Sequence, residues 1–128
     1  MTEGLQGKQS SRALLEPYDL RDAHHPERPF VGEPVCGPGW HGILMELIED
    51  LIRLGWDRRV VAIKEKCGSL RFQITQRDDA ILDRIDAAFQ RSHETCEECG
   101  APGTWLDENG WMSTLCEPCR TSRRSRGA

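Results

Sequence analysis

At 128 residues, of which 38 % are hydrophobic and 30 % charged, the chain fits one domain with a modest core. No apolar run approaches the roughly 20 residues of a membrane span, and the first twenty residues lack the hydrophobic region of a secretory signal peptide, so we expect a cytoplasmic protein that does not engage membranes. The net charge of −4 argues against a general affinity for nucleic acid.

Residues 1–39 are rich in proline, glycine and polar residues, and they keep no helical or strand period. We expect a flexible start followed by an extended arm laid over the domain. Phe30, Val31 and Val35 are the side chains expected to anchor this arm.

Residues 40–54 predict the first helix, because apolar residues recur on one broad face. These residues are Ile43, Leu44, Leu47, Ile48, Leu51 and Ile52. Gly55 follows at the position where a left-handed residue commonly ends a helix. Trp40, at the start of the helix, is expected to close the core.

Residues 59–75 alternate as strands do, and Cys67 and Gly68 stand where a two-residue turn would join two of them. That turn predicts a hairpin whose apolar residues pack on the helices. Its expected cross-strand pairs are Ile63 with Phe72, Lys64 with Arg71, Lys66 with Ser69 and Val61 with Ile74.

The outer face of this hairpin gathers three cations, Lys64, Lys66 and Arg71, which we call the cationic face. Like charges directly opposite one another are destabilising, so a compensating anion is expected. One interpretation is an anionic partner, which a rigid sheet with an arginine can grip. The other is a solvated face that acids of the arm neutralise. Those acids are Asp19, Asp22, Glu27 and Glu33.

Residues 78–93 predict the second helix, with Asp78 and Asp79 suited to its N-terminus by capping and by the helix dipole. The helix runs nearly into Cys96, so it should dock the segment that follows rigidly against the rest. Its expected buried stripe consists of Ile81, Leu82, Ile85, Ala88 and Phe89.

Two Cys-x-x-Cys pairs, Cys96 with Cys99 and Cys116 with Cys119, flank a short connection. Four thiolates at about 2.3 Å close a tetrahedron around a metal and leave no open position. The spacing therefore predicts a structural zinc site, in preference to two disulfides, which a reducing compartment disfavours. His93 could be a ligand only by displacing one of these cysteines.

The connection between the two pairs predicts a hairpin, because Asn109 and Gly110 form the strongest short-range turn signal available. Residues 94–119 are therefore expected to form a zinc ribbon, in which Gly100 supplies a positive φ just after the first pair. Pairing around the turn sets Glu108 opposite Trp111, Leu106 opposite Ser113 and Thr104 opposite Leu115.

The remaining cysteines, Cys36 and Cys67, are expected to be free thiols. A second metal site made of His24, His25, Cys36 and His41 is conceivable, but its irregular spacing favours solvated loop histidines. Cys36 with His41 is also the only imaginable thiol–imidazole pair. We therefore assign no catalytic residue and expect no enzyme activity.

Charge is segregated along the chain: residues 53–77 carry a net +5 and residues 78–119 a net −8. Residues 120–128 add four arginines and no acid, and we expect a disordered basic tail there. The acidic ribbon is a poor phosphate binder, because affinity for nucleic acid depends on neutralising phosphates with Lys and Arg.

These elements predict an α+β fold: a helix, a β-hairpin, a second helix and a C-terminal zinc ribbon with four cysteine ligands. We expect a single domain at residues 40–119, preceded by the arm at 1–39 and followed by the tail at 120–128.

Several short motifs resemble a family of small proteins found in bacteriophages, prophages and bacterial genomes. The motifs are Gly39-Trp40, Ile63-Lys64-Glu65-Lys66-x-Gly68-x-Leu70-Arg71-Phe72, Ser92, Thr95-Cys96-Glu97-x-Cys99-Gly100 and Gly110-Trp111-x-x-Thr114-Leu115-Cys116-x-x-Cys119. The resemblance covers roughly residues 36–119. The chain departs from it at Cys67, where the family tends to have an aromatic residue, and at Gln73, where it tends to have Tyr. The resemblance implies a phage or mobile-element setting and says nothing about mechanism.

These features favour a zinc protein that acts by binding a macromolecular partner, foremost a host protein surface, through the cationic face. The alternative is a nucleic-acid-binding accessory protein that uses the same face and the arginine tail, with four tryptophans available for stacking on bases. No small-molecule substrate is indicated.

Overall fold

The computed structural model describes residues 11–32 and 34–127, and the α+β class predicted from the sequence is confirmed. Its N-terminal elements are the 3-10 helices η1 (Ser11–Leu14), η2 (Glu16–Tyr18) and η3 (Pro38–Trp40) and the short strand β1 (Arg21–Asp22). The middle of the chain forms α2 (His41–Arg53), β2 (Arg59–Val60), β3 (Ala62–Lys66), β4 (Ser69–Gln73) and α3 (Asp79–Ser92). The C-terminal part forms β5 (Thr104–Glu108), β6 (Trp111–Leu115) and α4 (Glu117–Gly127).

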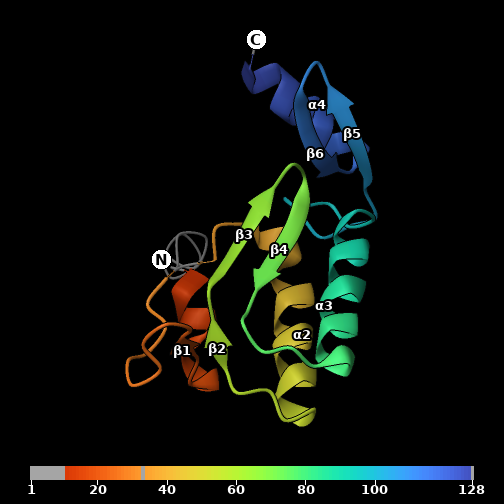
Figure 1. The fold of residues 1–128 in the computed structure, drawn as a ribbon. Coiled ribbons are helices and arrows are strands. Elements are labelled where there is room, and N and C mark those ends of the chain that lie inside the picture. The colour runs from red at the N-terminus through yellow and green to blue at the C-terminus, as the bar shows by residue number, and fades with distance from the viewer. Residues whose placement is uncertain (1–10, 33, 128) are drawn as a thin grey trace.

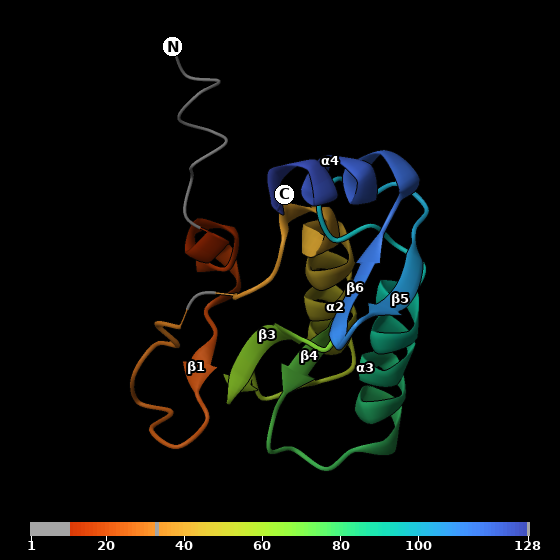
Figure 2. The ribbon, with the colours of Figure 1, turned by 90° about the horizontal axis from the view of Figure 1, so that it is seen from above.

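The β3–β4 hairpin packs on α2 and α3, and the ribbon with α4 caps the end of the molecule at which the hairpin turns (Figure 1). The arm lies on the opposite side of the hairpin from α3 in both views (Figures 1 and 2). None of the helices in the described part of the chain is long and apolar enough to cross a membrane.

The two long helices follow their predicted bounds closely. Gly55 ends the α2 segment with φ +88°, and the Asp78 carboxylate caps α3 by accepting a hydrogen bond from the Ile81 N–H at 3.2 Å. Trp40 is fully buried, as predicted. The stripe predicted on α3 is only partly buried, however, since Leu82 is 38 % exposed. The reason is that the hairpin does not extend over this side of α3.

The hairpin has the predicted turn and register over most of its length. Cys67 and Gly68 have φ values of +55° and +78°, and Ile63, Lys64 and Lys66 face Phe72, Arg71 and Ser69. The prediction that Val61 packs on the helices is wrong: Val61 is 41 % exposed, whereas Val60 is buried. A bend at Val61 separates β2 from β3, and a shift of one residue moves a strand side chain to the other face.

The described part of the arm lies over the domain, as predicted, and it also contributes to the core. Leu15, Leu20 and Ala23 are buried, and β1 pairs in parallel with β2. Two of the predicted anchors are wrong, because Val31 and Val35 are 58 % and 68 % exposed. An irregular segment has no helical or strand period, so its sequence does not indicate which of its apolar residues pack against the core. Residues 1–10, where the predicted flexible start begins, lie outside the described residues.

The prediction of a disordered tail is also wrong, because residues 117–127 form α4. Arg120 is only 3 % exposed and donates to the Glu108 carboxylate and to the Thr104 carbonyl oxygen, both at 2.7 Å. Arg123 pairs with Glu98. Acids of the ribbon thus neutralise the tail and hold it in place, an outcome that a charge count along the chain does not reveal.

The ribbon docks on the rest of the molecule through close backbone contacts at two points. At the first, the Gly39 N–H donates to the Glu97 carbonyl oxygen at 2.9 Å, and the Trp40 indole N–H donates to the Thr95 carbonyl oxygen at 2.8 Å. A Cβ atom on Gly39 would lie 2.0 Å from the Cys96 carbonyl oxygen, so only glycine fits there. The sequence prediction that the ribbon docks rigidly has its physical basis in these contacts.

The tip of the β3–β4 hairpin makes the second docking point. The Trp105 indole N–H donates to the Cys67 carbonyl oxygen, and the Thr114 hydroxyl donates to the Gly68 carbonyl oxygen, each at 2.8 Å. The hairpin is therefore fixed at its turn by the ribbon as well as along its length by the helices.

We predict that Gly39→Ala destabilises the protein by on the order of 3 kcal/mol, because the new methyl group must displace backbone. Gly42→Ala is the matched control. A Cβ atom at Gly42 meets nothing within 4 Å, and alanine in a helix is favoured over glycine by up to about 1 kcal/mol. Chemical denaturation of the metal-loaded proteins measures both effects. Equal stability of the two variants would contradict the docking described here.

Candidate metal centre and partner-binding face

The four cysteines of the ribbon are positioned to hold a metal ion, as their spacing predicts. The Sγ atoms of Cys96, Cys99, Cys116 and Cys119 all lie within 4.8 Å of one another, and those of Cys99 and Cys116 are 3.6 Å apart. Four thiolates bound at about 2.3 Å to one tetrahedral ion would be about 3.8 Å apart. The observed spread therefore fits one ion with no remaining position for a substrate or water.

Local backbone structure aims each pair of thiols at this point. In the first pair, the Gly100 N–H donates to the Cys96 carbonyl oxygen at 2.9 Å, and Gly100 has φ +83°. In the second pair, Cys119 lies in the first turn of α4, where the Arg120 N–H donates to the Cys116 carbonyl oxygen at 2.9 Å. The predicted cross-strand pairs of the β5–β6 hairpin are confirmed, and this register brings the two turns face to face.

The electrostatics of the cluster favour a bound cation. Burial raises the pKa of Cys96, but the backbone N–H groups of Cys116, Cys99 and Glu98 donate to its sulfur and together lower that pKa to about 7. Hydrogen bonding to Cys116, together with burial and the other thiols, raises the pKa of Cys119 to about 12. The cluster thus stabilises one negative charge and resists further ones, which is the situation that a metal ion relieves.

Glu97 connects the first cysteine pair to the ribbon hairpin and was not singled out as a functional residue by the sequence. Its carboxylate is buried and accepts a hydrogen bond from the Thr114 N–H at 3.0 Å. Burial raises the pKa of Glu97, although the Thr114 N–H and the charge of Arg123 oppose the increase. The spacing Cys-Glu-x-Cys therefore places an acid where it braces the turn instead of facing solvent.

The alternative metal ligands do not gather. Within residues 11–32 and 34–127, the four ribbon cysteines are the only group of three or more His, Cys, Asp or Glu whose ligand atoms converge. His93 lies instead between Phe89 and Trp105, with ring centroids 4.8 and 6.2 Å away, and its Nε2 contacts the Ser69 hydroxyl at 2.5 Å. His93 thus packs the junction between α3, β4 and the ribbon.

No acid in the described part of the arm pairs with the cationic face. The arm acids interact elsewhere: Asp19 pairs with Arg21 at 2.8 Å, and the Asp22 carboxylate accepts from the backbone of His24. Glu27 lies near His25 and Arg28, and Glu33 is outside the described residues.

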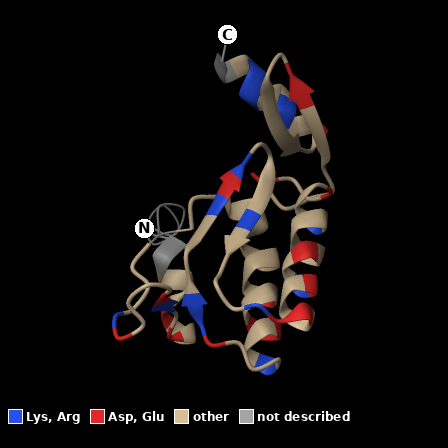
Figure 3. Cartoon of the chain, in the orientation of Figure 1, with Lys and Arg blue, Asp and Glu red and all other residues tan. Residues whose placement is uncertain are grey.

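Among the described residues, no ion pair involves Lys64, Lys66 or Arg71. Figure 3 shows the blue segments of β3 and β4 that carry them. The Arg71 guanidinium lies over the Phe89 ring at 5.2 Å, and its Nε is buried without a hydrogen-bond partner in the part of the chain that the structure describes. Within residues 11–32 and 34–127, the interpretation that acids of the arm neutralise the cationic face therefore has no support.

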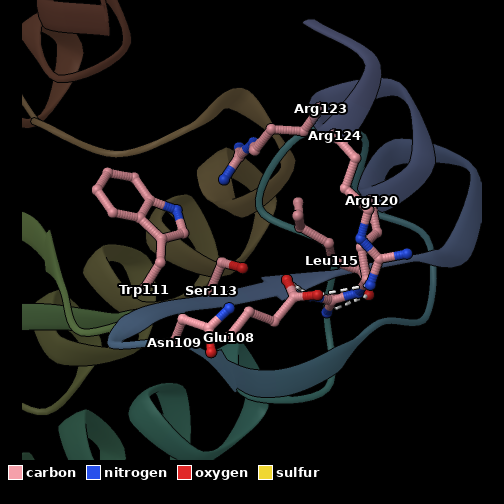
Figure 4. A pocket seen from close by; sticks show the side chains of 8 residues that line it. All are labelled: Glu108, Asn109, Trp111, Ser113, Leu115, Arg120, Arg123 and Arg124. Atoms are coloured by element: carbon pink, nitrogen blue, oxygen red, sulfur yellow. Dashed lines mark hydrogen bonds and ion pairs between the residues drawn. The ribbon is translucent and has the colours of Figure 1, made fainter. Parts of the chain in front are cut away.

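A pocket of about 410 Å³ lies between the β5–β6 hairpin and α4 (Figure 4). Trp111 and Ser113 line it from β6, and Arg123 and Arg124 line it from α4. A disordered tail would form no such pocket, so the sequence prediction missed it. Both arginines are already paired with glutamates of the ribbon, which leaves the pocket little unbalanced positive charge.

No protein-family model, curated protein or solved structure matches the chain. The roles of the motif residues therefore come from the geometry alone. Gly39, Trp40, Gly68 and Thr114 all lie at the two docking points of the ribbon, so these motif positions maintain the fold.

We predict that Cys36 and Cys67 are both free but differ strongly in reactivity. Cys67 is exposed on the hairpin turn, whereas burial, with the charges of Glu97 and Glu65, raises the pKa of the half-buried Cys36 to about 11. At pH 8 only about 0.1 % of Cys36 is then thiolate, the species that reacts. Cys67 should be alkylated at least about tenfold faster, and the rate at Cys36 should rise with pH until about 11.

Peptide mass spectrometry of the metal-loaded protein after timed exposure to iodoacetamide measures both rates. The Cys67→Ser variant removes the fast site and leaves Cys36 as the slow one. A Cys36–Cys67 disulfide in the native protein, or equal rates at the two positions, would contradict this assignment.

Proposed function

We propose that the four ribbon cysteines bind one zinc ion and that its role is structural. A tetrahedral set of four cysteine ligands is typical of structural zinc, and it leaves no coordination position for catalysis. The docking of the first cysteine turn against Gly39 and Trp40 supports this role, because it links the metal site to the buried core.

The zinc prediction is tested by Cys116→Ser, with Cys67→Ser as the matched control. Zinc in small modules contributes on the order of 10 kcal/mol at neutral pH, so the first variant should lose stoichiometric zinc and unfold at least the ribbon. The control should keep one zinc per chain, because Cys67 lies outside the cluster. Elemental analysis and circular dichroism measure both properties. Absence of zinc from the wild type, or an unchanged content in Cys116→Ser, would refute the proposal.

We propose further that the protein acts in the cytoplasm by binding a protein partner through the cationic face. The observation that carries this proposal is that three cations share one face of a rigid hairpin and no acid of the described chain pairs with them. A surface that is already rigid loses little entropy on binding. The resemblance to phage proteins extends the proposal to a partner that belongs to a host cell.

A protein partner is favoured over nucleic acid by the state of the C-terminal arginines. Arg120, Arg123 and Arg124 each pair with a glutamate of the ribbon. The basic tail, which was the second support for nucleic-acid binding, is therefore largely neutralised within the molecule. In the described part of the chain, the unpaired cations of the hairpin form a small basic surface on an acidic protein, and phosphate binding requires more positive charge than that.

The test compares two double variants that change the net charge equally. Lys64→Glu with Arg71→Glu reverses the cationic face, and Arg28→Glu with Arg77→Glu reverses exposed charges elsewhere. Proteins that co-purify with the tagged wild type from host cells are quantified by mass spectrometry for each variant. The partner should be lost only from the first variant while zinc content and melting are kept.

Survival of partner binding in the cationic-face variant would refute the proposed contact. Retention on DNA would favour the alternative function, and it should then weaken steeply with salt, with a slope of roughly 0.9 per phosphate contacted. A protein partner should give a shallower dependence.

A further inference from the structure

We propose that the groove between β4 and α3 binds an extended peptide segment of the protein partner, which adds to the free edge of β4 as a third strand and pairs an acidic side chain with Arg71. This inference rests on the proposed function, since it specifies how a partner of the cationic face is recognised. Strand addition of this kind takes its affinity from main-chain hydrogen bonds and its specificity from alternate side chains.

The hydrogen-bond pattern shows which main-chain groups of β4 face its outer edge. Val35 occupies the outer edge of β3, where it donates to the Ile63 carbonyl oxygen at 3.0 Å and accepts from the Glu65 N–H at 2.7 Å. In an antiparallel pair the main-chain groups alternate between facing the neighbouring strand and facing away from it. Since those of Ile63 and Glu65 face away from β4, those of their partners Phe72 and Leu70 face away from β3.

Only part of this edge is satisfied within the molecule. The Ser92 hydroxyl accepts a hydrogen bond from the Leu70 N–H at 3.0 Å. In the described part of the chain, no loop or side chain hydrogen-bonds the outward N–H and carbonyl groups of Phe72. An extended peptide would supply partners for them.

The surface beside this edge is apolar and incompletely covered. A groove of about 400 Å³ runs between β4 and α3, and Leu82, Ile85 and Phe89 line it from the helix. Two packed helices are about 8–10 Å apart, whereas neighbouring strands are only about 4.8 Å apart, so a two-stranded hairpin does not cover both helices. In Figures 1 and 2 α3 lies on the β4 side of the hairpin, where a third strand would cover it.

Arg71 defines the chemistry of the peptide. It lines the groove, and its Nε is buried and without a partner among the described residues. A buried donor left unpaired is costly, and a carboxylate satisfies a guanidinium with strong, charge-assisted hydrogen bonds. The peptide therefore needs apolar residues at alternate positions, facing α3, and an acidic residue on the other face beside Arg71. Asp86, which also lines the groove, disfavours a phosphate backbone as occupant.

The first experiment selects random 12-residue peptides displayed on phage against the zinc-loaded full chain. We expect enriched peptides to carry alternating apolar residues and at least one Asp or Glu. The affinity of a synthetic copy is then measured for Leu82→Lys and for Leu54→Lys. The two leucines are 38 % and 40 % exposed, so neither change should unfold the protein, but only Leu82 lines the groove. Affinity should fall about tenfold or more for Leu82→Lys alone.

The second experiment tests the main-chain pairing. Copies of the selected peptide are methylated on one backbone nitrogen at a time. Methylation should weaken binding by about tenfold at alternate positions, which face β4, and have little effect at the positions between them, because only the first set donates to the strand. Peptide binding should also slow hydrogen exchange of the Phe72 amide.

The outcomes separate this inference from the proposed function. One outcome is that partner binding is lost in Lys64→Glu with Arg71→Glu but kept in Leu82→Lys. In that case the cationic face binds the partner and the groove does not. Failure to enrich any peptide, or equal effects of methylation at successive positions, overturns strand addition. A concentration-dependent dimer that Leu82→Lys dissociates would show that a second copy of the chain occupies the groove, which also overturns the proposal.

Discussion

The structure depends on the packing of one backbone turn, residues 96–100, against the rest of the chain. Gly39 meets this turn so closely that a single methyl group would overlap the Cys96 carbonyl oxygen. Glu97 in the same turn is hydrogen-bonded to Thr114, whose hydroxyl donates to the tip of the central hairpin at Gly68. The candidate metal site is therefore continuous with the core, through the hairpin tip on one side and α2 on the other.

The distribution of ion pairs decides which positive charges remain without an acidic partner. A charge count along the chain leaves the C-terminal arginines unpaired, but the fold brings them to Glu98 and Glu108. The cations of the hairpin are few, and in the described chain their charges have no acidic partner. A protein with a net charge of −4 thus keeps a small basic surface on a hairpin that is fixed at its turn by the ribbon and on its inner face by the core.

The two-stranded hairpin also explains why the second helix is less buried than its amphipathic pattern suggests. Leu70 and Phe72 cover the inner side of the sheet, but Leu82 lies beyond the edge of β4. An unfinished sheet over an apolar helix leaves both main-chain groups and side chains without partners at the same place. Arg71, which lies over Phe89 there, joins this edge to the cationic face.

Features that depend on contacts near in the chain could be predicted from the sequence alone. The turn residues at Cys67-Gly68 and Asn109-Gly110 set the register of two hairpins, and the Cys-x-x-Cys spacing predicted the four cysteines that are positioned to hold a metal ion. Other features emerged only in three dimensions. They are the packing of the arm into the core, the helix at residues 117–127, and the exposure of Val61 and Leu82. Most of these depend on a partner distant in the sequence: the arm on β2, the tail on the acids of the ribbon, and Leu82 on the width of a sheet. Periodicity shows that a side chain can be buried, but the surface that covers it is supplied by the fold.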